Sequence, residues 1–292
     1  MINDHDKIVG AFFDSQNVAH GFVRDKTGEI AQFDVTGSAG TEAIAVNSNG
    51  TIVGFYDDSA KVAHGFIRTA NGAISSFDVK GSYGTFGYGI NDAGTIAGVY
   101  LNSSGFSRGF VRLSDGTITK LVIPGEREVG VGSINSSGTI AGSYQDENTL
   151  YGHGFLWSSD GTITVVDYPG AYSTDVDCIN DDGTFAGYYM VDGSHMHGFI
   201  EASNGTTTSF DPKRAVGTVP YGINSDDEIA GTFGRKRGDS TFSFLRRPDG
   251  RISRFAVEGS TNTESLSINE QHKITGYYED SAGHAHGFLR VP

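Results

Sequence analysis

The sequence of 292 residues is poor in several residue types, and each shortage excludes a class of protein. It has a single cysteine, Cys178, so it can form neither an internal disulfide nor a cysteine-based metal site. No apolar run reaches the roughly 18 residues of a membrane-spanning helix. Lys and Arg number 21 against 35 Asp and Glu, and a net charge of −14 disfavours nucleic acid. We therefore expect neither a membrane nor a nucleic acid as a partner.

The few basic residues gather at Arg235, Lys236 and Arg237, with Arg246 and Arg247 close behind. We interpret this cluster as solvated loop charges, because the rest of the chain is acidic and offers no basic stripe. The first residues show no basic and apolar leader. Low lysine with abundant Gly, Ser and Thr favours a secreted or periplasmic protein, and a cytoplasmic location stays open.

Glycine and aromatic residues are abundant, with 42 Gly, 19 Phe and 13 Tyr. Glycine at this density is typical of turns and close strand contacts, and runs of helix-forming residues are missing. The composition therefore predicts an all-β protein.

An internal repeat of about 44 residues runs through the whole chain. One copy reads Ile-Asn-Asp-Ala-Gly-Thr-Ile-Ala-Gly-Val-Tyr over residues 90–100, and its relatives recur every 44 or 45 residues. This regularity leaves no room for another domain, so we expect one domain over residues 1–292. The repeats start at Ile2, Val46, Ile90, Ile134, Ile179, Ile223 and Ile268.

Each repeat contains four short β-like stretches. In the second repeat they cover residues 41–47, 51–56, 63–68 and 73–79, with turns at Asn49-Gly50 and Asn71-Gly72. Turn residues between β-branched and aromatic runs predict hairpins. Four antiparallel strands repeated every 40 to 50 residues are typical of a β-propeller blade.

The number and order of the blades follow from the same repeat. Stacking the sheets radially buries both faces of each, and a closed ring leaves no exposed end. We favour seven blades, the first short of its first strand and the last short of its fourth; six blades is the alternative. The first stretch carries small residues at alternate positions, such as Ala43 and Ala45, so we place it innermost.

The repeat resembles a family of extracellular bacterial proteins called HAF repeats, named for a His-Ala-Phe tripeptide in the third stretch. The Ile-Asn-x-x-Gly-x-Ile-x-Gly-x-Tyr and Phe-Asp-Val-x-Gly runs also look like that family. The resemblance covers essentially the whole chain and implies a repeat architecture and export, but no reaction. Here the middle residue is Gly, and two repeats depart further, at Arg108-Gly109-Phe110 and Phe242-Ser243-Phe244. The matching tripeptides are His20-Gly21-Phe22, His64-Gly65-Phe66, His153-Gly154-Phe155, His197-Gly198-Phe199 and His286-Gly287-Phe288.

The five repeated histidines are interpreted as scaffold, because copies on different blades diverge and cannot meet at one ion. We expect each to anchor a neighbouring blade through a hydrogen bond. The aspartate of the fourth stretch is expected to fix a strand end or to pair with a neighbouring basic residue. It occurs at Asp34, Asp78, Asp167 and Asp211.

Residues that break the repeat are the candidates for function. Three and five residues before the repeated Asn, side chains share one face of the innermost stretch and vary in type. Crowded carboxylates there have raised pKa values, which suits acid–base chemistry or a Ca²⁺ ion. The alternative is that they only line a water-filled channel. The candidates are Asp177, Tyr88 and Tyr221 for catalysis, Glu42 and Phe86 for binding, and Asp175 and Glu264 for metal.

Three loop residues complete the candidates. Arg127 and Arg214 interrupt loops of small residues and would clamp a carboxylate or a uronic acid; as an alternative, they are solvated charges. His195 lies outside the repeat and is the histidine best placed by sequence for catalysis.

Two classes of function remain open. The first is a monomeric ligand-binding propeller with one site over the central channel, for a glycan, a metabolite or a protein. The second is a lyase or hydrolase acting on an acidic sugar or a small cyclic metabolite. The fold suits both classes, so whether the chain is an enzyme stays open at this point.

Overall fold

A computed structural model describes residues 1–235 and 240–292; Lys236 and Arg237 of the basic cluster lie outside them. The described residues form 26 strands and no helix, as the composition predicts. In the second repeat the strands are β4 (Gly40–Val46), β5 (Ile52–Asp57), β6 (Ala63–Arg68) and β7 (Ile74–Phe77). They pair in chain order as an antiparallel sheet. The four predicted strands and their hairpin order are therefore confirmed.

The chain divides into two compact units, which are described separately. The first comprises Met1–Ile140 and Tyr144–Leu150, the second Ala141–Ser143 and Tyr151–Pro292. The other strands of the first unit are β1 (Ile8–Phe13), β2 (Ala19–Arg24), β3 (Ile30–Phe33), β8 (Gly84–Ile90), β9 (Ile96–Leu101), β10 (Ser107–Arg112), β11 (Ile118–Lys120) and β12 (Glu126–Ile134). The division runs through β13 (Ile140–Asp146).

The second unit continues the same pattern of strands. Its first complete sheet pairs β16, β17, β18 and β19 in order, and β20 to β23 repeat it. Its strands are β14 (Gly152–Trp157), β15 (Ile163–Val166), β16 (Ser173–Ile179), β17 (Phe185–Met190), β18 (Met196–Glu201), β19 (Thr207–Phe210), β20 (Gly217–Ile223), β21 (Ile229–Gly234), β22 (Thr241–Arg246), β23 (Ile252–Phe255), β24 (Asn262–Ile268), β25 (Ile274–Glu279) and β26 (Ala285–Arg290).

The first and last sheets are incomplete in the predicted way. The sheet β1-β2-β3 has no full first strand, and only a bridge between Ile2 and Ile8 stands in its place. The sheet β24-β25-β26 has no fourth strand.

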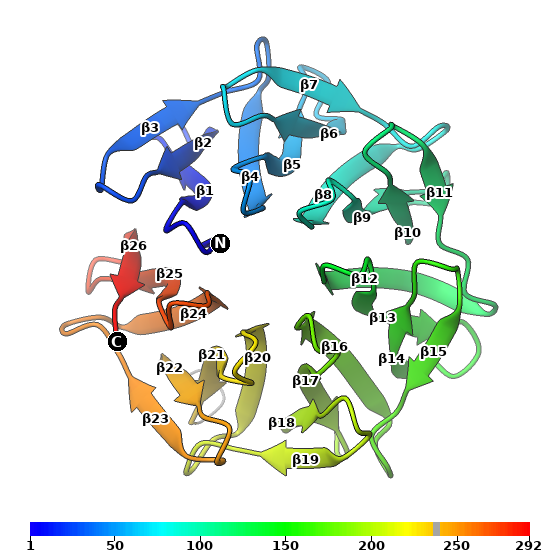
Figure 1. Cartoon of the computed structure of the whole chain (residues 1–292), viewed down its shortest axis with the longest axis vertical. Coiled ribbons are helices and arrows are strands. Elements are labelled where there is room, and N and C mark those ends of the chain that lie inside the picture. The colour runs from blue at the N-terminus through cyan, green and yellow to red at the C-terminus, as the bar shows by residue number, and fades with distance from the viewer. Residues whose placement is uncertain (236–239) are drawn as a thin grey trace. The chain divides into compact units, whose positions relative to one another are not determined.

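Within each unit, the first strands of successive sheets lie side by side, as Figure 1 shows for β4 and β8 and for β16, β20 and β24. The fourth strands pair only with the third strand of their own sheet and lie on the far side. The prediction that the first strand is innermost within its unit is confirmed.

The core lies between successive sheets. The Phe of each tripeptide fills it, and Phe66, Phe110 and Phe244 are fully buried. Each also meets a ring from the preceding sheet edge to face, as Phe33 meets Phe66 with centroids 6.0 Å apart. Burial of rings in this geometry provides most of the apolar contact that holds one sheet to the next.

The repeated Asn joins consecutive repeats, a role that the sequence analysis did not assign. Asn47 Nδ2 donates to the backbone oxygen of Asn91 at 3.1 Å, and its Oδ1 accepts from the Thr51 amide at 2.9 Å. Asn180 repeats the contact in the second unit, donating to the Asn224 oxygen at 3.0 Å. These amides are buried, so each bond satisfies a polar group that water cannot reach.

In the described part of the chain, the hydrogen bonds of His20, His64 and His197 go to an aspartate of their own repeat and not to a neighbouring sheet, so that expectation is wrong for them. His64 Nδ1 lies 3.0 Å from Asp78 Oδ1 of its own repeat, and its ring stacks on Tyr56. The pairing of the fourth-stretch Asp with a basic residue is confirmed, and the basic residue is this histidine. The hairpin places the fourth strand antiparallel to the third, and this brings His64 and Asp78 together although they are 14 positions apart. The same pair recurs at His20–Asp34, His153–Asp167 and His197–Asp211.

The interpretation of Arg246 as a solvated loop charge is also wrong. Arg246 is buried at the end of β22, and its guanidinium lies over the Phe210 ring, 5.1 Å from the centroid. Arg68 stacks on Phe33 in the same way at 4.8 Å. These arginines join successive sheets through cation–π contacts.

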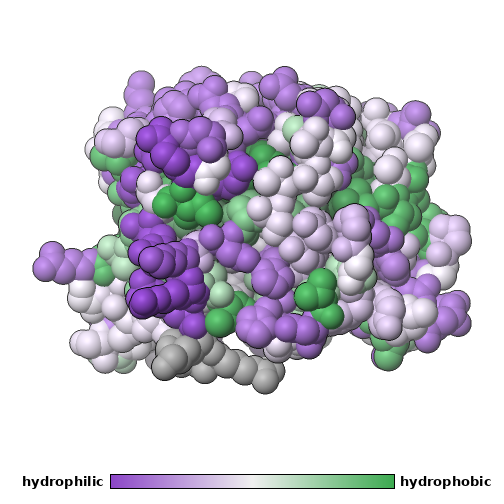
Figure 2. Space-filling view, turned by 90° about the horizontal axis from the view of Figure 1, so that it is seen from below, coloured by the Kyte–Doolittle hydropathy of each residue, from purple (hydrophilic) through white to green (hydrophobic). Residues whose placement is uncertain are grey.

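The face of the molecule in Figure 2 is mainly polar. Figure 2 shows hydrophobic residues only as small separate patches among hydrophilic ones on the face it presents. In the described part of the chain, no helix is long and apolar enough to cross a membrane.

Candidate functional site

A β-bulge in the first strand sets the position of the most variable side chains. In β16, Val176 pairs with Gly187 and Cys178 with Ala186, so Asp177 between them has no partner residue on β17. The same register shift places Tyr221 between Pro220 and Gly222 of β20. A bulge bends the strand and re-aims the extra side chain. The candidates three residues before the Asn are therefore bulge residues: Ile44, Tyr88, Asp177, Tyr221 and Leu266.

The second strand carries a glycine opposite the bulge, because the backbone of the first strand comes too close there for any side chain. A Cβ on Gly187 would lie 1.8 Å from the Asp175 carbonyl oxygen. No side chain fits at that distance, so the second strand carries Gly in each repeat where the first strand bulges. The bulge is thus scaffold, while the residue that it displays is free to vary.

Six acidic and tyrosine side chains gather on neighbouring strands of the second unit, and we name them the acid–tyrosine cluster. Asp175 and Asp177 come from β16, Tyr221 from β20 and Glu264 from β24. Because β20 contacts both β16 and β24, one tyrosine lies between carboxylates of two sheets. The cluster is Asp175, Asp177, Tyr188, Tyr221, Glu264 and Tyr277.

The tyrosines Tyr188 and Tyr277 were not among the candidates from sequence. Each sits directly opposite an acid on the adjacent strand, Tyr188 opposite Asp175 and Tyr277 opposite Glu264. The facing carboxylate contributes, after burial, to a raised tyrosine pKa in both pairs, Asp175 for Tyr188 and Glu264 for Tyr277. The available signal was an aromatic residue in the second strand wherever the first strand carries an acid.

The charges of the cluster shift the pKa values of its own members. Burial and the neighbouring Asp175 charge raise the pKa of Asp177 well above its usual range. Burial, followed by the charges of Asp177 and Glu264, raises the pKa of Tyr221. Burial, followed by the charge of Asp175, also raises the pKa of Tyr188 above its usual value. Asp177 therefore keeps its proton to a higher pH than an ordinary aspartate does, and in that form it can donate a proton or a hydrogen bond.

One oxygen of this cluster has no hydrogen-bond partner among the described residues. Asp177 Oδ2 is buried and makes no hydrogen bond within the described residues, although the residue as a whole is only partly buried. Tyr221 beside it is 39% exposed. A buried polar atom without a partner costs about 1–3 kcal/mol. A ligand that reaches this oxygen past Tyr221 would recover that cost.

The structure does not gather a metal-ion ligand set. Among the described residues, no group of three or more His, Cys, Asp or Glu side chains is arranged to hold a metal ion. Asp175 and Glu264 lie on β16 and β24, separated by β20. Calcium binding stays a prediction from sequence.

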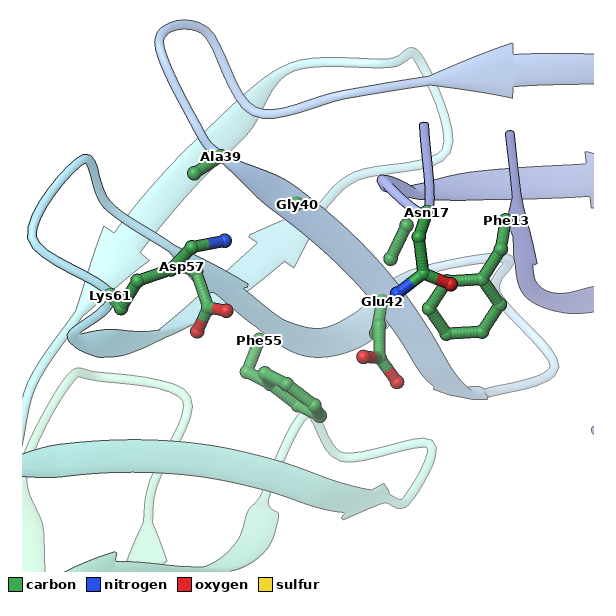
Figure 3. Close-up of a pocket in the computed structure, with 9 residues that line it drawn as sticks. Phe13, Asn17, Ala39, Gly40, Glu42, Phe55, Asp57 and Lys61 are labelled. Carbon is green, nitrogen blue, oxygen red and sulfur yellow. The ribbon is translucent and has the colours of Figure 1, made fainter. Parts of the chain in front are cut away.

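A second group of candidates lies in the first unit. Phe86 packs edge to face on Phe55 at 4.9 Å between centroids and is stacked beside Tyr88 at 6.4 Å. Burial, then the Glu42 charge, raises the pKa of Tyr88. Glu42 lines a pocket between the first two repeats, together with Phe13, Phe55 and Asp57 (Figure 3).

His195 makes its contacts in its own loop and with the next strand. Its Nδ1 lies 2.9 Å from Asp192 Oδ2 and 2.8 Å from Ser194 Oγ, and its ring is near His197. Both neighbours use the same ring nitrogen, so the three residues do not form a serine–histidine–aspartate relay. These contacts, among the described residues, do not join His195 to the acid–tyrosine cluster.

The two candidate arginines belong to different units. Arg127 of β12 lies over the Phe106 ring, 5.3 Å from its centroid. Arg214 is exposed in the turn before β20 and has a positive φ of 67°. Their role as a carboxylate clamp stays a prediction.

Comparison with known proteins identifies structures that share this fold. No family model matches the chain, and no curated protein matches it. Its structure is similar to the β-propeller domain of the Trilobed protease from Pyrococcus furiosus, with a TM-score of 0.70, 10% identity and coverage of 97% of this chain and 90% of that one. It is similar to the BP39L lectin from Burkholderia pseudomallei, with a TM-score of 0.63, 9% identity and coverage of 98% and 92%.

A puromycin-hydrolyzing peptidase from Mycobacterium tuberculosis is similar over 98% of this chain, with a TM-score of 0.70 and 10% identity. This chain spans about half of that protein, 49% of its length. At these identities the likeness concerns the fold alone. The all-β repeat architecture predicted from sequence is therefore confirmed: the chain folds as a β-propeller.

Proposed function

We propose that this β-propeller binds carbohydrate and that the acid–tyrosine cluster is its site. The observation that carries the proposal is Asp177 Oδ2, which is buried without a hydrogen-bond partner in the described structure and lies beside the partly exposed Tyr221. Sugars offer hydroxyl groups that satisfy such an oxygen, and apolar ring faces that pack on tyrosine. A fold shared with a lectin is compatible with this use but adds no residue to it.

The charge of the cluster supports a hydroxyl-rich ligand. Asp175, Asp177 and Glu264 form no ion pair with a basic side chain in the part of the chain that the structure describes. Three tyrosine hydroxyls accompany them, so both donors and acceptors are present. A protonated Asp177 adds one more donor.

The test is a glycan array followed by calorimetry with the best sugar. Tyr221→Ala removes the exposed ring, and we expect affinity to fall at least tenfold. Asp177→Asn keeps the shape but changes the donor pattern, and we expect a smaller loss. Thr208→Ala, on the exposed outer strand β19, is the matched control and should bind like the unaltered protein. Absence of sugar binding, or equal affinity in all variants, would contradict the proposal.

A second candidate is hydrolysis or elimination on an acidic sugar. The observation that favours it is the raised pKa of Asp177 next to a second carboxylate, which suits a general acid. Here Asp177→Asn removes the transferable proton, so turnover should fall by about 100-fold or more while binding persists. The assay measures new reducing ends or unsaturated products from uronic-acid polysaccharides. Turnover that survives this change rules out Asp177 as the acid.

The resemblance to HAF repeats stays a prediction from the tripeptides and the repeated runs. Export and a monomeric state are likewise proposals, to be checked by cell fractionation and by light scattering.

A further inference from the structure

A cavity of about 100 Å³ opens between the first two repeats, within the first unit. Phe13 ends β1, Glu42 lies on β4, and Phe55 and Asp57 lie on β5. Figure 3 shows Glu42 and Phe55 at its centre, with Asp57 on one side and Phe13 on the other. A cavity needs only about 10–15 Å³ to hold a water molecule, so this one has room for part of a larger ligand.

The cavity exists because the repeat is broken here. At the next seam, 44 residues along, Phe86 replaces Glu42 and Leu101 replaces Asp57. There a Cβ built on Gly84 would lie 3.2 Å from the Phe86 ring and 3.6 Å from Leu101 Cδ1, so these side chains cover the glycine. At the first seam, the three atoms nearest to a Cβ built on Gly40 all belong to Ala19, at 3.7–3.8 Å, and none belongs to Glu42 or Asp57. The carboxylates of Glu42 and Asp57 thus stand where the next seam has two apolar side chains that fill the space.

The lining combines apolar rings with hydrogen-bonding groups. Phe13 is 60% exposed at the rim. The Phe55 ring packs edge to face against the Phe86 ring, with centroids 4.9 Å apart. Glu42 and Asp57 offer acceptors, while the Asn17 amide and the Lys61 ammonium at the rim offer donors. Neither carboxylate forms an ion pair among the described residues, although Lys61 lines the same pocket.

Such a lining suits a ligand with both an apolar face and polar edges. A pyranose ring has axial hydrogens on one face that pack on phenyl rings, and hydroxyls around its edge that pair with carboxylates and amides. A small metal ion would leave the apolar edges of Phe13 and Phe55 without a packing partner, and the Lys61 ammonium in the same lining would repel it. A flat apolar ligand would leave both carboxylates desolvated.

We infer that this pocket is a second carbohydrate subsite, which takes a single pyranose ring packed on Phe13 and Phe55 with its hydroxyls on Glu42 and Asp57. It extends the proposed sugar binding to a position in the first unit, and it rests on none of the residues of the acid–tyrosine cluster.

The experiment is saturation-transfer NMR with the methyl glycosides of glucose, galactose and mannose. We expect saturation on the ring hydrogens of one face for at least one of them. The double variant Glu42→Phe with Asp57→Leu copies the next seam of the same chain, so the fold has a precedent for it. Saturation from this pocket should disappear and its affinity should fall at least tenfold. Phe13→Ala, at an exposed position, should weaken binding in the same direction and is available if the double variant does not fold.

Tyr221→Ala separates the two sites. If both exist, this variant keeps the Phe13 pocket, and the double variant keeps the cluster. Binding lost with Tyr221→Ala but unchanged in the double variant would overturn the second subsite and leave the proposed function standing. Binding lost only in the double variant would support the subsite and overturn the cluster. The absence of pyranoside binding to the unaltered protein would overturn the subsite.

Discussion

The repeated Asn illustrates what single residues do in this chain. The Oδ1 of Asn47 closes its own turn, and its Nδ2 reaches the backbone of the next repeat. The repeat spacing identified the position, but the reach across 44 residues depends on how two sheets pack. Only a side chain with one acceptor and one donor serves both contacts.

Asn47→Asp should destabilise the protein although it is nearly isosteric. The acceptor to Thr51 is kept, while the donor to the buried Asn91 oxygen is lost and a charge faces that oxygen. We expect a loss of about 2 kcal/mol in the free energy of unfolding, measured by urea denaturation. Asn71→Asp, in an exposed turn where Oδ1 accepts from the Ala73 amide and from the Thr69 hydroxyl, is the control and should change stability by less than about 0.5 kcal/mol. Equal losses would refute the donor role.

For the repeated histidines, the sequence-based prediction named the wrong hydrogen-bond partner. Their repetition predicts a scaffold role, which stays a prediction, while the partner was assigned to the wrong place. His64 pairs with Asp78 because strands β6 and β7 are adjacent, and that adjacency was already part of the predicted hairpin order. The correct partner was therefore predictable from register, had the third and fourth strands been aligned residue by residue.

At the scale of strands, the bulge in the first strand is the feature that places the site. Alternation along the strand correctly predicted that Glu42 and Ile44 share the less buried face. It did not predict that the second of these positions has no partner on the adjacent strand. A bulge adds a residue without altering the hydrophobic pattern around it, so sequence periodicity does not reveal it.

Gly54→Ala tests the strand geometry. The added Cβ would lie 2.0 Å from the Glu42 carbonyl oxygen, so β4 or β5 must move. We expect a loss of about 2–3 kcal/mol in the free energy of unfolding, seen as a lower thermal midpoint. Gly234→Ala is the matched control near the end of a second strand, because no atom of the described residues lies within 4 Å of its added Cβ. A harmless Gly54→Ala would mean that the bulge is absent in solution.

For the whole molecule, the paired acidic and basic groups predict how stability depends on pH. The hydrogen bond to Asp34 is the main cause that raises the pKa of His20 above 6.5. For His64, burial lowers the pKa, but bonds to Asp78 and Asp58 outweigh it. The folded state thus holds these protons more tightly than the unfolded state. Their stabilisation is complete below pH 6.5 and is lost as pH rises through the folded pKa values.

We therefore expect the urea midpoint to fall between pH 6 and pH 8. The double variant His20→Gln with His64→Gln should lower stability more at pH 6 than at pH 8. Parallel curves for variant and unaltered protein would contradict this assignment. On the acid side, the Val62 amide lowers the pKa of Asp58, so its contribution is lost only as pH falls below 3.8.

By itself the sequence determined the repeat length, the four strands, their hairpin order and the incomplete first and last sheets. These are local properties, because each strand pairs with the next one along the chain and turn residues mark every reversal. It also singled out Asp175, Asp177, Tyr221 and Glu264 by subtraction of what repeats. A closed ring of seven blades stays a prediction.

Only the tertiary structure decided which of those residues meet. Asp177 and Tyr221 lie 44 positions apart, and their proximity depends on sheet packing and on a bulge in each first strand. The same packing added Tyr188 and Tyr277, and opened a cavity at Glu42 where the next repeat is filled by Phe86. Periodicity records which face a side chain takes, while the distance between faces of different sheets is set by the side chains packed between them.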